Sequence, residues 1–239
     1  MHQRSTRRNF LKQLAVAGSA VVLVPSVSAC KSGKETTPAD TTPTETPETQ
    51  ATTPEVEEAM LEVPTTKPEG WDPIEFNKTR GNQGAIPDSY LGSINGPDGE
   101  NKHLGKHLPY QPEIDASLIP AGFIALMWGD PDKGHARHPN APKNESNNNE
   151  GHWYNWIKIR KATDGEVQEL QSSYTDWPGT AGDDNKYAVF GGGEDITSDS
   201  GKNTIYLAAL PEDVQPGDTV RIYAHCLTHG EYVDFMTIS

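Results

Sequence analysis

The chain has 239 residues, with 34 acidic and 20 basic side chains and a formal net charge of −14. This balance argues against a nucleic-acid binder, because binding to phosphate backbones needs clustered cations. No internal repeat stands out.

The first 29 residues have the pattern of an export signal. Four cations precede an apolar stretch at 13–29, and these are Arg4, Arg7, Arg8 and Lys12. The stretch is too short and too broken by Gly18 and Pro25 for a membrane span, which needs about 20 mostly apolar residues. Segment 6–12, TRRNFLK, resembles a twin-arginine signal, which an export receptor reads. An ordinary secretory signal is the alternative.

The end of this signal resembles a lipobox. Val27-Ser28-Ala29-Cys30 places small residues before a cysteine whose thiol would carry diacylglycerol. Each buried CH₂ of an acyl chain contributes about 0.8 kcal/mol to membrane binding, so more than one chain gives a stable anchor. We therefore expect an exported protein, periplasmic or at the cell surface, held at the membrane through Cys30. Cleavage after Ala29 with a free Cys30 is the alternative.

A spacer and a single domain follow. Residues 30–68 hold the lipidated cysteine and a stretch rich in Thr, Pro and Glu, which predicts a disordered linker. Residues 69–239 remain for one globular domain. If Cys30 is lipidated, Cys226 has no partner for a disulfide within the chain, and it becomes a candidate metal ligand or reactive thiol.

The domain reads as an all-β sandwich, because short apolar runs alternate with Gly, Pro, Asn and Asp and no convincing helical period is present. The expected strands are 122–128, 153–160, 186–190, 204–209, 219–224 and 232–238. In the fifth of these, Val220, Ile222 and Ala224 share one face. Continuing this alternation puts Cys226 on the apolar side and turns His225 away.

Seven of the eight histidines lie close to three short segments, 103–109, 135–152 and 225–230. The last segment places Cys226 and His229 three residues apart, where a thiolate and an imidazole can reach one ion. Zinc, copper and iron all accept such ligands. The sequence therefore predicts a metal site, with the metal open at this point.

Four motifs in order carry a family resemblance. They are Lys106-His107-Leu108-Pro109, His138-Pro139-Asn140, His152 followed by Trp156-Ile157, and Cys226-Leu227-Thr228-His229-Gly230. Together they resemble the iron-binding domain of superoxide reductase, the neelaredoxin and desulfoferrodoxin family, from about His103 to the C-terminus.

The resemblance implies an immunoglobulin-like β-sandwich and one mononuclear non-haem iron, cycling between Fe²⁺ and Fe³⁺. His107, His138, His152 and His229 would surround the iron in a plane, and Cys226 would bind along the axis. Lys106 would draw superoxide to the open side, where one-electron reduction gives hydrogen peroxide. An electron-donor protein is implied as a partner. The second, rubredoxin-like iron domain is missing, because its cysteines are absent.

The chain departs from the family pattern at several positions. Gly105 stands where the family often has a glutamate that serves as sixth ligand, so another residue or water would take that role. An Asn-rich stretch at 140–150 separates His138 from His152, which makes His135 a rival to His138. His103 rivals His107 in the same way. Pro109 and Pro139-Asn140 favour His107 and His138.

Two other interpretations remain open. A cupredoxin-like electron carrier would use two histidines, Cys226 and a weak axial methionine, for which Met236 is the candidate. The other is a non-enzymatic lipoprotein with a structural metal or with none, which would act as an adhesion or binding module.

Overall fold

The computed structural model describes residues 59–145, 149–177, 186–192 and 195–239. The predicted signal at 1–29, the lipobox with Cys30 and the first part of the spacer lie outside these residues. Within the described part of the chain, no helix is both long enough and apolar enough to cross a membrane.

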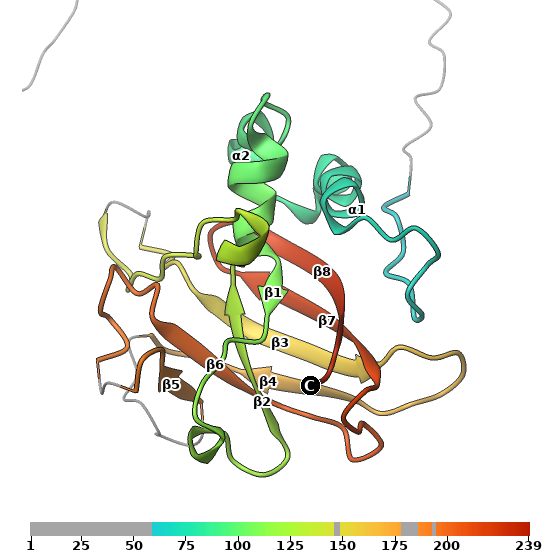
Figure 1. Cartoon of the computed structure of the whole chain (residues 1–239). Helices are drawn as coiled ribbons and strands as arrows, with labels where there is room; N and C mark the ends of the chain where they lie inside the picture. The colour runs from blue at the N-terminus through green and yellow to red at the C-terminus, as the bar shows by residue number, and fades with distance from the viewer. Residues whose placement is uncertain (1–58, 146–148, 178–185, 193–194) are drawn as a thin grey trace, which may run out of the picture. The chain divides into compact units, whose positions relative to one another are not determined.

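The domain is built from two antiparallel four-stranded sheets, which confirms the predicted all-β sandwich (Figure 1). One sheet has the order β1-β2-β6-β5, with β1 Pro109–Tyr110, β2 Phe123–Trp128, β5 Tyr187–Val189 and β6 Thr204–Ala209. The other has the order β4-β3-β7-β8, with β3 Tyr154–Lys161, β4 Glu169–Ser173, β7 Thr219–Cys226 and β8 Gly230–Thr237. The two short strands β1 and β4 were not expected from the sequence.

The core lies between the sheets. Alternate residues of β2, such as Leu126, pack with alternate residues of β3 and β7, such as Ile157 and Ile222. Each is at most 1% exposed, and full burial of such a side chain contributes about 1.5–3 kcal/mol. Cys226 belongs to this same cluster, so its sulfur lies at the edge of the core and not on the surface.

The first sheet is apolar on both faces. Ala125 and Met127 of β2 point away from the main core and form a second cluster with Ile205 and Leu207 of β6. Side chains of the segment 110–119 pack against this second cluster. This accounts for the nearly continuous apolar run of β2, which a strand exposed on one face would not show.

A helical cap covers the end of β8 (Figure 1). Its helices are α1 Pro73–Arg80, η1 Gly81–Ala85, α2 Asp88–Ile94, η2 Gly99–Leu104 and η3 Gly105–His107. Short 3₁₀ turns, η4 Ala116–Leu118 and η5 Pro131–Lys133, lie elsewhere. Ile86, Ile94 and Leu104 of the cap pack against Tyr232 of β8. Asn77 exchanges hydrogen bonds of 2.7 and 2.8 Å with the backbone of Val233, so both backbone groups of this residue are paired on the outer edge of β8.

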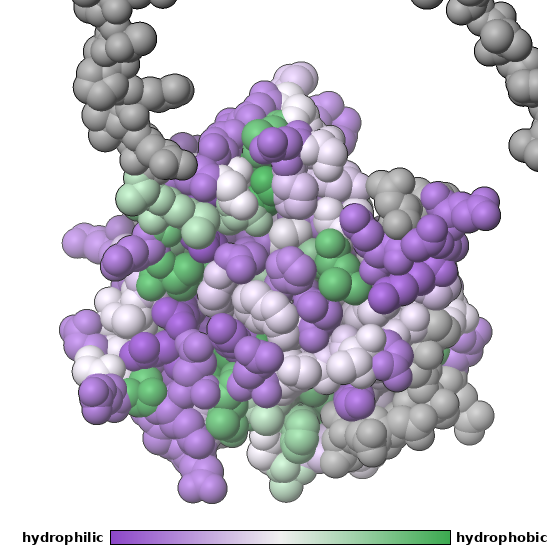
Figure 2. Space-filling view, turned by 180° about the vertical axis from the view of Figure 1, so that it is seen from behind, coloured by the Kyte–Doolittle hydropathy of each residue, from purple (hydrophilic) through white to green (hydrophobic). Residues whose placement is uncertain are grey.

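The described end of the predicted spacer is tied to the domain. The Arg80 side chain donates to the Leu61 carbonyl at 3.1 Å, and Arg221 donates to the Pro64 carbonyl at 3.1 Å. Leu61 and Pro64, which belong to the predicted spacer, are therefore in contact with the domain predicted to begin at residue 69. Seen from behind, the described surface is mainly hydrophilic, with apolar residues in separate patches (Figure 2).

Candidate metal centre

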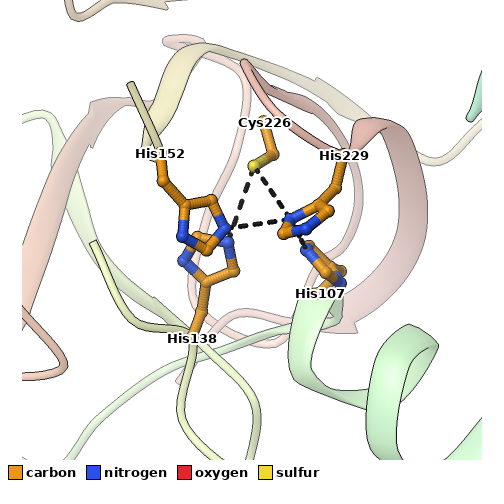
Figure 3. Close-up of side chains that lie close together, drawn as sticks. All are labelled: His107, His138, His152, Cys226 and His229. Carbon is orange, nitrogen blue, oxygen red and sulfur yellow. Dashed lines mark hydrogen bonds between the residues drawn. The ribbon is translucent and has the colours of Figure 1, made fainter. Parts of the chain in front are cut away.

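Five side chains with metal-binding atoms converge at one end of the sandwich (Figure 3). Their ligand atoms all lie within 4.8 Å of one another, and the residues are His107, His138, His152, Cys226 and His229. The Nδ1 atom of His229 lies 3.0 Å from Nε2 of His107 and 2.9 Å from Nε2 of His152. The Cys226 sulfur lies 3.6 Å from His138 Nε2 and 3.7 Å from His229 Nδ1.

Cys226 and His229 come from the hairpin between β7 and β8. The register pairs Cys226 with Gly230, so the intervening turn holds the imidazole close to the thiol. Gly230 has a φ of 84°, and a side chain there would come within 2.2 Å of the Ala85 carbonyl oxygen. The glycine therefore serves two purposes: it closes the hairpin and lets the helical cap approach the ligands.

His107 is presented by the helical cap. Its Nδ1 lies 2.7 Å from the His103 carbonyl oxygen, which can only accept, so the proton resides on Nδ1 and the Nε2 lone pair faces the other ligands. Tyr232 of β8 stacks on the ring, with centroids 4.3 Å apart and an interplanar angle of 7°. The Tyr232 hydroxyl also donates to the His229 carbonyl at 2.9 Å. One tyrosine thus positions two ligands.

His138 and His152 come from the long connection between β2 and β3. The His138 amide bonds to the Trp128 carbonyl at 2.9 Å, and His152 forms an isolated β-bridge with Ala141. Between them, Asn140 is anchored by the Tyr206 hydroxyl at 2.7 Å and by the Gly201 carbonyl at 2.7 Å. The anchored Asn140 explains how a long loop can hold two ligands in place.

The four imidazoles are neutral at physiological pH. Burial lowers the pKa of His107 and His138 well below the usual value, and it lowers the pKa of His152 to about 4 and of His229 to about 2. A neutral imidazole keeps the lone pair that a metal requires. The cluster is therefore ready to bind a cation without first losing protons from histidine.

The thiol of Cys226 behaves differently. Burial raises its pKa to about 12, although the backbone amides of His229 and Thr228 oppose this shift. A buried thiolate needs a nearby positive charge, and a bound metal ion deprotonates a coordinating thiol outright. The four imidazoles direct lone pairs inward, and two backbone amides are directed at the sulfur of the buried thiol. These groups suit a bound metal ion better than a core in which polar atoms only form hydrogen bonds with one another.

Three other histidines of the described residues lie outside this donor set. His103 is buried, and its Nε2 lies 3.3 Å from the Tyr232 hydroxyl. His225 points away from the core and bonds to the Asn155 side chain at 2.6 Å, as the alternation of β7 predicts. His135 packs its ring against Gly105, and a side chain at Gly105 would come within 2.4 Å of His135 Cδ2.

Lys106 stands beside the donor set as a partly buried cation. Burial lowers its pKa, and a thiolate at Cys226 would raise it. Its charge in turn helps to lower the pKa of all four ligand histidines. Among the described residues, no carboxylate forms an ion pair with Lys106.

The composition of the donor set bears on the kind of metal. Structural zinc sites are closed by four ligands, whereas five donors converge here. Blue-copper sites use two histidines, a cysteine and a weak axial methionine. Met236 pairs with Val220 and Cys226 pairs with Gly230, so Met236 lies six positions along the hairpin from the cysteine. At about 3.3 Å per residue this places Met236 roughly 20 Å away.

No family model, curated protein or solved structure matches this chain. No similarity to a known protein therefore adds to what the residues of this chain show about the fold and the five converging donors.

Proposed function

We propose that the chain is a superoxide reductase, with one iron held by the four histidines and by Cys226. The observation that supports this best is the convergence of four neutral imidazoles and one thiol beside Lys106, which forms no ion pair with any carboxylate in the described part of the chain. A bound iron would supply a one-electron couple, so that superoxide gains one electron and two protons and leaves as hydrogen peroxide.

Different residues of the protein contribute to this reaction in different ways. Lys106 attracts the anionic substrate, because a cation at a partly desolvated site focuses the local potential even in a chain of net charge −14. His152 and Lys106 are only partly buried, which leaves an approach to the site from solvent. Cys226 would hold the iron as a thiolate and would increase electron density at it, as cysteine ligands do in haem-thiolate enzymes.

The test is to load the protein with ferrous iron without oxygen and to mix it with superoxide. A reductase produces as much peroxide as the superoxide consumed and oxidises the iron. Dismutation produces half as much peroxide, with the iron regenerated. Zinc-loaded protein is the control, because zinc has no redox chemistry. Dismutation stoichiometry, or consumption no faster than in the zinc control, would contradict the proposal.

We further propose that the mature protein is exported and anchored at a membrane through lipid on Cys30. The supporting pattern is the twin-arginine-like segment 6–12 followed by the lipobox at 27–30. Expressed with its own leader, the protein should partition into detergent, and Cys30→Ser should move it to the aqueous phase. Retention of the substituted protein with salt-washed membranes would contradict the anchor.

A further inference from the structure

The outer face of the β4-β3-β7-β8 sheet carries an aromatic cluster next to the metal centre. Cys226 points into the core, and its chain neighbour His225 points out of the sheet. The His225 ring stacks on Trp156 of β3, with centroids 5.6 Å apart and an interplanar angle of 12°. Tyr223 meets the same tryptophan edge-on at 5.0 Å. All three rings are only partly buried, so they reach the surface.

Two cations accompany these rings. The Lys158 ammonium lies 5.0 Å from the centre of the Trp156 ring and 5.8 Å from that of Tyr223. Arg160, two residues further along β3, donates to the carbonyls of Thr163 and Gly165 at 3.1 and 3.3 Å. We call the surface formed by Trp156, Lys158, Arg160, Tyr223 and His225 the outer patch.

The outer patch is positive although the chain is strongly acidic. Two carboxylates border it on the neighbouring strands, and each is paired with an arginine: Glu231, which also accepts from the Tyr223 hydroxyl, with Arg80 at 3.3 Å, and Glu169 with Arg221. Among the described residues, neither Lys158 nor Arg160 forms an ion pair with a carboxylate. A surface with partly exposed aromatic rings and with two cations that pair with no carboxylate of the described residues has the composition of a protein interface.

A shallow depression adjoins the outer patch. It measures about 340 Å³, and its lining includes Trp156, Asn155, Trp153, Lys143 and Leu227. Leu227 follows Cys226 directly, so a molecule seated here would lie within one residue of a metal ligand. The depression adds a third cation, Lys143, and a recess into which a partner can insert a side chain.

These observations lead to one inference, which rests on the proposed function. We propose that the outer patch is the docking surface of a small acidic electron-carrier protein that returns the metal centre to its reduced state. One electron passes from the reduced carrier through His225 and Cys226, and no covalent bond forms or breaks.

The arrangement separates the two reactants. Superoxide approaches Lys106, which belongs to the helical cap, whereas the carrier approaches the outer face of the sheet behind Cys226. A docked carrier would then leave the substrate side open. Electron-transfer complexes are small and transient, typically below about 1,200 Å² of buried surface, and a patch of five residues with a bordering depression suits that size.

The test uses full-length iron-loaded protein in its oxidised form and reduced plant-type ferredoxin, an acidic one-electron carrier, as the probe. The variant is Lys158→Glu combined with Arg160→Glu. Its matched control is Lys67→Glu combined with Lys102→Glu, which makes the same charge change at exposed lysines outside the patch. Stopped-flow absorbance gives the second-order rate constant of iron reduction, and ascorbate serves as a small reductant that needs no docking surface.

The patch variant should lose about tenfold or more in its rate with ferredoxin at low salt, within the range of electrostatic steering. It should also lose most of the salt dependence, and its rate with ascorbate should be unchanged. Equal losses in the patch variant and in the matched control would overturn the proposal, because net charge alone would then explain the effect.

A second measurement separates this inference from the proposed function. Binding of oxidised ferredoxin to zinc-loaded protein, followed by NMR line broadening, requires no redox chemistry. Broadening should centre on the Trp156 indole and should disappear in the patch variant. Binding elsewhere, or none at all, would overturn the docking surface even if the iron protein reduces superoxide. Docking at the patch without iron redox chemistry would instead contradict the proposed function.

Discussion

The ring of His135 occupies the space that a side chain at Gly105 would need. A β-carbon built on Gly105 would lie 2.4 Å from Cδ2 of His135 and 2.7 Å from its Nε2. Gly105 itself has a φ of −57°, which any residue can adopt, so the glycine is required by the neighbouring ring and not by its backbone. Any side chain directly before Lys106, a glutamate included, would have to displace the His135 ring.

This contact predicts a sign change in a double-mutant cycle. In the native background, Gly105→Ala should lower the free energy of unfolding of the metal-free protein by about 1–3 kcal/mol, because it overpacks against His135. In a His135→Ala background the same change should stabilise the protein by about 0.5–1 kcal/mol, because alanine orders a helical backbone better than glycine does. Denaturant unfolding of the four proteins measures both values. Equal effects in the two backgrounds would contradict the contact.

The ligand set predicts which histidines control iron occupancy. Replacing His107, His138, His152 or His229 by Ala should lower iron affinity by more than the roughly 10–100-fold that loss of an outer-shell partner costs. His225→Ala is the matched control, because this residue is adjacent to Cys226 but points away from the centre. Anaerobic iron titration with metal analysis gives the affinities. Full iron retention by the His107 variant, with loss in a His103→Ala variant, would reverse the assignment.

The pKa values predict how iron binding depends on pH. Between pH 6 and 8 the ligand histidines are neutral, because burial lowers the pKa of His107 and His138 well below the usual value, that of His152 to about 4 and that of His229 to about 2. The Cys226 thiol, with a pKa of about 12, is protonated in the same range. Iron must therefore displace one proton, and its affinity should rise about tenfold per pH unit. Competition against a chelator at pH 6, 7 and 8 gives the slope. Cys226→Ser, measured in the same way, should be nearly flat.

The same shifts set the acid stability of the metal-free protein. The folded-state pKa of the ligand histidines lies below the unfolded value of about 6.5, so the unfolded state binds more protons as the pH falls. Stability should thus be lost from about pH 6.5 downwards, through pH 4 and below. A stability curve that stays level between pH 6.5 and 4 would show that the imidazoles are not buried in neutral form.

The sequence predicted the sheets better than the helical cap. Strand β7 shows clear apolar alternation at Val220, Ile222 and Ala224, because it buries one face against the opposite sheet. Helix α1 buries Asn77 and Arg80, two polar residues that hydrogen-bond to strand and linker backbone. A helix whose buried positions are polar carries no apolar period, so the sequence pattern did not reveal it.

The candidate site likewise has parts that local sequence patterns reveal and parts that depend on tertiary packing. Cys226 and His229 could be placed from local spacing on one hairpin, and the alternation of β7 separated Cys226 from His225. The choice between His103 and His107 depends on tertiary packing, since only the stack on Tyr232 and the His103 carbonyl direct His107 inward. The ring of His135 against Gly105 joins segments 30 residues apart, and no local pattern predicts such a contact.

The last prediction concerns Lys106, to which we assign attraction of the anionic substrate. Lys106→Ala should leave iron content unchanged and slow the reaction of the ferrous protein with superoxide by on the order of tenfold. Lys106→Arg should restore much of the rate, because it keeps the charge. Lys102→Ala is the matched control, since that lysine is exposed and paired with Asp98 at 2.7 Å. Pulse radiolysis of ferrous protein measures the bimolecular rate constants.

Ionic strength distinguishes attraction from a structural role. A partly buried charge near a reacting anion contributes a few kcal/mol at an effective dielectric constant near 20, and salt screens the part of this interaction that acts through solvent. The native rate should therefore fall as salt rises, and the Lys106→Ala rate should change less. Equal rates and equal salt slopes in the two proteins would contradict the assignment of Lys106 to substrate attraction. Substrate capture would then have to depend on another cation of the same segment.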